Sequence, residues 1–214
     1  MTKDQIVSQA RRKINAQDDD FWSDEEVLIA LKEVEDELSL EAETIENTYT
    51  TSSVASQAQY TKPANAHTIK RITYDGYKVK RITERQKDAI GFGTNITITG
   101  TPGYYMEFED YFELYPVPDA VKTLKLWTLD EAGLLSSSST TLSTPSKYHW
   151  AVIIGLSAQL AMKETGHPLA APLAVRWEEV KKKVRSHVRR SKRGDGPAMV
   201  NVEEIQPISE FGTV

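Results

Sequence analysis

The sequence predicts a mainly helical α+β protein: a four-helix bundle with an inserted small antiparallel β region and an extended C-terminal arm. Apolar residues recur at helical spacing near both ends of the chain, whereas the middle alternates between apolar and polar side chains. A Gly-Asp-Gly-Pro break at 194–197 precedes a tail without helical period. The expected units are a helical bundle from 1–50 and 144–194, a β-rich insertion over 60–130, and an arm over 195–214.

Capping boxes mark the first two helices. Gln5 follows Thr2, and Glu26 follows Ser23, at the spacing where the N-cap side chain and the third helical residue bond each other's backbone N–H groups. The second helix continues with large apolar residues three or four apart and acidic residues on its other faces. Residues 18–46 hold thirteen acidic residues and one Lys, so this helix is strongly negative.

The middle of the chain favours β structure. Asp75-Gly76 is typical of a hairpin turn, and it joins alternating segments at 68–74 and 77–82. Further strands are expected at 104–109, 111–115 and 122–129. Residues 47–59 contain few large apolar side chains, and we expect a flexible excursion there that orders on a partner.

The last two helices differ in character. Residues 148–163 are apolar almost all round and predict the most buried helix, while the final helix over about 171–190 is amphipathic. Its expected buried face comprises Trp177, Val180, Val184 and Val188. Its basic set comprises Lys181, Lys182, Lys183, Arg185, Arg189, Arg190, Lys192 and Arg193. The matching acidic set on the second helix comprises Glu33, Asp36, Glu37 and Glu41. We expect the basic set to face either a neighbouring subunit or DNA, and the acidic set to face a neighbouring subunit.

DNA binding by the basic helix gains support from counterion release at phosphates. Against it, the chain carries a net charge of −5, and aromatic residues that could stack on bases are not interleaved with the basic ones. We favour a helix face that complements the acidic helix of the same or a neighbouring subunit. Loose, sequence-independent contact with passing nucleic acid stays open as an alternative.

Few residue types remain for catalysis or metal binding. The chain has no cysteine, which excludes disulfides and thiolate chemistry, and its four histidines lack HxH or HxxxH spacing. No GxxxxGK[ST] phosphate loop and no GxSxG elbow occurs. We therefore expect no enzyme, no cofactor and no metal. The longest apolar stretch, 150–156, is too short to span a bilayer, and no signal peptide is evident, so we expect a cytosolic protein without a membrane partner.

The tail that follows the helix-breaking Gly-Asp-Gly-Pro segment is unusually apolar. Its candidate docking residues are Val200, Val202, Ile205, Pro207, Ile208 and Phe211. In water these side chains would form an exposed apolar surface, and full burial of each large one contributes about 1.5–3 kcal/mol before ordering costs. We expect the arm to dock on another chain, with strand addition as one mode; folding back on its own domain is the alternative.

Several segments, in a fixed order, carry a resemblance to a known family. They are the first helix, FWSDEEVLIALKEVEDELS, IKRITYDGYKVKRIT, GTPGYYMEFEDYFELYPVPDAVKTLKLW and YHWAVIIGLSAQLAMKETG with the charged helix after it, and they span residues 1 to about 193. In this order they resemble the head-to-tail adaptor, or connector, proteins of tailed bacteriophages.

The resemblance implies a structural virion protein. It implies a dodecameric ring at the virion neck, a C-terminal arm that grips the portal protein, and a tail-side nozzle or stopper partner. Genomic DNA would pass through the lumen without being read, and the subunit would reside in the host cytoplasm during assembly. Two alternatives stay open: a nucleic-acid-binding protein that uses the basic last helix, or another head or tail completion protein such as a stopper.

Overall fold

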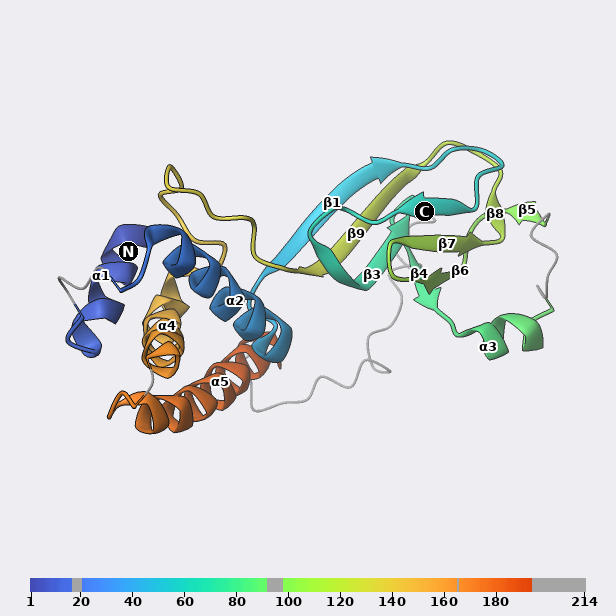
Figure 1. Cartoon of the computed structure of the whole chain (residues 1–214). Helices are drawn as coiled ribbons and strands as arrows, with labels where there is room; N and C mark the ends of the chain where they lie inside the picture. The colour runs from blue at the N-terminus through green and yellow to red at the C-terminus, as the bar shows by residue number, and fades with distance from the viewer. Residues whose placement is uncertain (17–20, 92–97, 165, 194–214) are drawn as a thin grey trace, which may run out of the picture.

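The computed structural model describes residues 1–16, 21–91, 98–164 and 166–193, which form a helical part and a β part side by side (Figure 1). The helical part contains α1 (Lys3–Lys13), α2 (Asp24–Ala42), a 3-10 turn (Ser146–Tyr148), α4 (His149–Lys163) and α5 (Ala170–Arg193). The β part contains β1 (Glu46–Ser52), β2 (Gln59–Thr61), β3 (Ala66–Tyr74), β4 (Tyr77–Arg81), α3 (Glu84–Ala89), β5 (Thr99–Gly100), β6 (Tyr104–Glu107), β7 (Tyr111–Tyr115), β8 (Val117–Pro118) and β9 (Thr123–Asp130).

The predicted four-helix bundle with a small β insertion is wrong. The described residues form five helices and a curled seven-stranded sheet, and α3 lies at the far end of the β part, away from the other helices (Figure 1). The sheet has a hydrophobic core of its own, distinct from the helical core. Helical periodicity identifies helices but carries no information about how they cross, and here α2, α4 and α5 run in clearly different directions.

The helical part is organised around α4, which packs against α1, α2 and α5. Val152, Leu156 and Ala158 on α4 have no exposed surface, in agreement with its nearly continuous apolar sequence. Both predicted capping boxes form, at Thr2 with Gln5 and at Ser23 with Glu26. The four predicted apolar residues of α5 are all buried, which fixes the side of that helix that faces solvent.

The large sheet has the strand order β1-β9-β3-β4-β6-β7-β2. All neighbours are antiparallel except β4 and β6, and the predicted hairpin at Asp75-Gly76 joins β3 to β4. The sheet curls so that apolar residues of β3 and β9, such as Ile72 and Leu126, share one core with Phe112 and Leu114 of β7. The opposite face of β1, β9 and β3 therefore lies outside this core.

The flexible excursion predicted at 47–59 is wrong for most of its length. Residues 46–52 form β1, which pairs in register with Leu129 to Thr123 of β9. The segment has few large apolar residues because it is a sheet edge with one side in solvent, and its threonines suit such a half-exposed strand. Tyr49 points to the core side and donates to Asp130 at 2.5 Å.

Buried hydrogen bonds join the two parts. The Ser39 hydroxyl of α2 donates to the carbonyl oxygen of Asp130 at 2.7 Å, where β9 ends. The Ser-rich connector then returns along α2, where Glu35 accepts from the backbone N–H of Thr144 at 2.7 Å. Burial raises the pKa of Glu35, although the bond from Thr144 opposes the shift. The β part thus follows α2 at a buried polar junction.

Candidate functional site

The seam between α2 and α5 is a charged cluster centred on Lys181. This side chain is only 5% exposed, and its Nζ contacts Glu37, Glu41 at 3.2 Å and Glu178 at 2.8 Å. Glu37 also accepts a hydrogen bond from Nε1 of Trp177 at 2.9 Å. The two oppositely charged helices therefore meet within one chain.

Burial alone would lower the pKa of Lys181, but hydrogen bonds to its three carboxylate partners outweigh it and hold the pKa above its ordinary value. Lys181 is therefore charged at neutral pH. Glu37 and Glu41 lie on α2 and Glu178 lies on α5, so the ion pairs of Lys181 with Glu37 and Glu41 join α5 to α2. Removing the cation would leave these carboxylates without their partner at the seam.

Most of the predicted acidic set is engaged inside the chain. Glu37 and Glu41 bind Lys181, while Asp36 binds Lys32 at 2.5 Å and accepts from the backbone N–H of Ala132. Glu33 is exposed and has no ion pair among the residues that the structure describes. Glu33 is thus the one member of the set whose carboxylate is free within the described chain to meet a second molecule.

The predicted basic set separates into two groups. Lys181 is buried and Lys192 binds Glu43 and Glu46, each at 2.8 Å, so both serve the fold of their own chain. The exposed row of α5 comprises Lys182, Lys183, Arg185, Arg189 and Arg190. Within the described residues these five side chains have no carboxylate partner, although Lys183 lies 5.6 Å from the ring centroid of Trp150. Arg193 ends the helix, and its side chain lies outside the described ones.

A second charged cluster fixes the end of α5 to the start of the sheet. Lys192 from α5 and Lys70 from β3 both bind Glu43 and Glu46, which flank the exit from α2. The hydrogen bond from Lys192, followed by that from Lys70, lowers the pKa of Glu43 to about 2. Three segments far apart in sequence are held together by this cluster.

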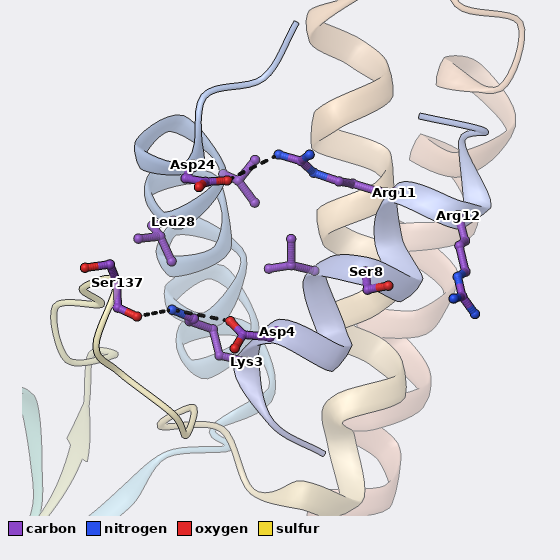
Figure 2. A pocket seen from close by; sticks show the side chains of 10 residues that line it. Lys3, Asp4, Ser8, Arg11, Arg12, Asp24, Leu28 and Ser137 are labelled. Atoms are coloured by element: carbon purple, nitrogen blue, oxygen red, sulfur yellow. Dashed lines mark hydrogen bonds and ion pairs between the residues drawn. The ribbon is translucent and has the colours of Figure 1, made fainter. Parts of the chain in front are cut away.

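A hollow of about 770 Å³ lies between α1, α2 and the Ser-rich connector (Figure 2). Figure 2 shows its charged side chains engaged at the rim: Lys3 donates to the carbonyl oxygen of Ser137 at 2.8 Å, and Arg11 lies 3.6 Å from Asp24. These contacts hold α1 against its neighbours. Among the described residues no three His, Asp or Glu side chains gather closely enough to hold a metal ion. In the same part of the chain, no helix has the length and apolarity to cross a membrane.

The predicted docking arm lies outside the described residues. Its candidate contacts Val200, Val202, Ile205, Pro207, Ile208 and Phe211 therefore stay predictions from the sequence.

Sequence reasoning missed that Lys181 is buried. The signal was present, because Lys181 lies four residues after Trp177 and three before Val184, which places it on the same helix face. The roles of Lys70 and Lys192 had no local signal, since each depends on a carboxylate more than twenty residues away.

The exposed row of α5 has no carboxylate partner within the described residues, so it is a charged surface that a second molecule can contact. The model of the SU10 adaptor protein family matches residues 1–197. The chain belongs to this phage adaptor family, and the resemblance to head-to-tail adaptors that its sequence predicts is confirmed. No curated protein matches the chain.

Proposed function

We propose that the protein is a subunit of a twelve-fold adaptor ring that joins the portal to the tail at the virion neck and continues the DNA channel. The observation that carries the proposal is the exposed row of α5, five cations on one side of a helix whose other side is buried in its own chain. Membership of an adaptor family supports the same assignment. Within the described residues the row has no carboxylate partner, so it is available to a second molecule.

A neighbouring subunit is the partner that we assign to the row. The chain carries a net charge of −5, so equal subunits repel unless opposite charges meet at their interface. Exposed carboxylates on α2, among them Glu25 and Glu33, supply the opposite charge on a different face of the helical part. A contact between two different faces is heterologous, and such contacts close into rings when the rotation between subunits allows it.

Ring formation should therefore depend on salt. On isolated portal rings we expect assembly to weaken roughly tenfold or more between about 50 mM and 500 mM NaCl, because exposed charge pairs are screened at high ionic strength. Negative-stain imaging and sedimentation of the mixture would measure it. The R185Q/R189Q variant should assemble poorly and lose most of the salt dependence. Assembly that is indifferent to salt would eliminate the assignment of the row to a subunit interface.

The arm should supply the portal contact. Deleting residues 201–214 removes five of the six candidate docking residues, Val202, Ile205, Pro207, Ile208 and Phe211, without touching any described element. We expect a monomer with unchanged circular dichroism and thermal midpoint that no longer co-sediments with portal. Full-length protein in the same gradient is the control. Normal co-sedimentation of the truncated chain would show that portal docking lies elsewhere.

A further inference from the structure

The solvent side of the large sheet carries a group of exposed basic side chains, formed where β1, β9, β3 and β4 lie side by side. The strand register defines it: Trp127 of β9 is paired with Arg71 of β3, and Lys125 is paired with Thr73. On β4, Lys78 is paired with Thr73, and Lys80 returns to the same side after the buried Val79. We call this surface, with Arg71, Lys78, Lys80 and Lys125 around Trp127, the outer sheet face.

The cations of the outer sheet face are exposed and free. Among the described residues none of the four forms an ion pair with a carboxylate. Two of them rest on the half-buried indole of Trp127, with Arg71 4.9 Å and Lys125 5.0 Å from the ring centroid. An aromatic platform holds the two charges in place without neutralising them.

Two carboxylates at the ends of these strands are bound by other residues. Glu46, at the helical end of β1, is bound by Lys70 and Lys192. Asp75, in the β3–β4 turn, is bound by Lys122 at 2.9 Å. The surface between these two pairs thus concentrates four positive charges in a chain whose net charge is −5.

The rest of the outer sheet face is hydroxyl-bearing. On β1, Thr48, Thr50 and Ser52 are exposed opposite Trp127, Lys125 and Thr123 of β9. No large aliphatic side chain is exposed on these rows within the described strands. The centres of protein–protein interfaces are depleted in Lys and Ser and gain aromatic and apolar area, whereas contacts to phosphate use mainly Arg, Lys, Ser and Thr.

We propose that the outer sheet face binds the phosphate backbone of double-stranded DNA without reading its sequence. The biological role of this contact rests on the proposed function, because a ring through which DNA passes would carry one outer sheet face on every subunit. Repetition around a ring would convert a weak contact per subunit into a firm hold on one duplex. The surface differs from the exposed row of α5, which we assign to a neighbouring subunit.

Fluorescence anisotropy of a labelled duplex of arbitrary sequence, titrated with the full-length protein at several NaCl concentrations, tests the proposal. Four phosphate contacts predict a slope of log K against log[salt] of roughly −3 to −4. In R71Q/K125Q we expect the slope to lose about two units and the affinity at about 50 mM NaCl to fall at least tenfold. K78Q/K80Q should show the same change, although it leaves the contacts to Trp127 intact and so separates charge loss from misfolding.

R185Q/R189Q is the matched control, because it removes two exposed cations from α5. Its DNA affinity should stay within about twofold of the wild type. The proposal is overturned if the wild type shows no affinity at low salt, or if the α5 variant loses as much affinity as the sheet variants. It is also overturned if the sheet variants keep DNA affinity but fail to assemble on portal, which would assign the face to a protein partner.

The same variants separate this proposal from the ring itself. Assembly of R71Q/K125Q on portal rings should equal that of the wild type. A wild-type chain that binds DNA through the outer sheet face yet forms no ring on portal would contradict the proposed function alone.

Discussion

Replacing Lys181 by Glu should destabilise the helical part by about 3–5 kcal/mol, the range for breaking a buried ion pair by removing one partner. The side chain is 5% exposed and bound to three carboxylates, so the substitution brings four negative groups together at one seam. A domain of this size has a total stability of about 5–15 kcal/mol, so a large share would be lost. Urea denaturation followed by circular dichroism measures the change.

The next residue supplies the control. Lys182 is exposed and has no carboxylate partner within the described chain, so K182E carries the same charge change and should alter stability by no more than about 0.5 kcal/mol. K181M removes the charge but keeps an apolar side chain of similar length, so its loss of stability should lie between those of K181E and K182E. Equal stabilities of K181E and K182E would show that the seam does not hold α5 on α2.

The pH dependence of the K181E deficit gives a second readout. Carboxylates that repel one another in the folded state have pKa values above those of the unfolded chain, so folding favours their protonated forms. The penalty is then fully present at neutral pH and shrinks as pH falls toward the ordinary Glu range near about 4.3. A deficit that stays constant from neutral to acid pH would indicate lost packing as its cause.

Short sequence motifs correctly predicted the helix starts and the β-turn. They could not predict contacts between residues far apart in the sequence. Capping boxes at Thr2 and Ser23 and the turn at Asp75-Gly76 depend on residues within a few positions, and all three form as expected. The strand β1 was missed because its stability comes from β9, more than seventy residues away. β1 also adds little apolar sequence to the sheet core, because it is a polar edge strand from which only Tyr49 packs against that core.

In the candidate site, too, local patterns were predicted and long-range contacts were not. The apolar stripe of α5 correctly predicted its buried face, and the charge of α2 correctly indicated a partner of opposite sign. The sequence left pairing within the same or a neighbouring subunit open, and Glu37 and Glu41 meet Lys181 in their own chain. Charge segregation along a sequence does not distinguish pairing within a chain from pairing between chains.

The closest approach of helices in the helical part depends on Gly155 of α4. A Cβ atom at this position would lie 2.6 Å from Cγ1 of Val34 on α2 and 3.0 Å from two ring atoms of Trp177 on α5. Neither neighbour can move freely, because Val34 is β-branched and fully buried and the Trp177 indole is bound to Glu37. Three helices therefore converge on one missing side chain.

G155A should consequently destabilise the protein by about 1–3 kcal/mol, the usual cost of overpacking, even though Ala favours an isolated helix by about 1 kcal/mol over Gly. G155L should cost more and expose apolar surface of the helical part. Thermal and urea unfolding measure both. G103A adds the same methyl group where the structure leaves open space, and it should leave stability nearly unchanged. If G155A proved as stable as the wild type, α2 and α5 would have to separate from α4 at little cost, and the helical part would be a looser scaffold than its packing indicates.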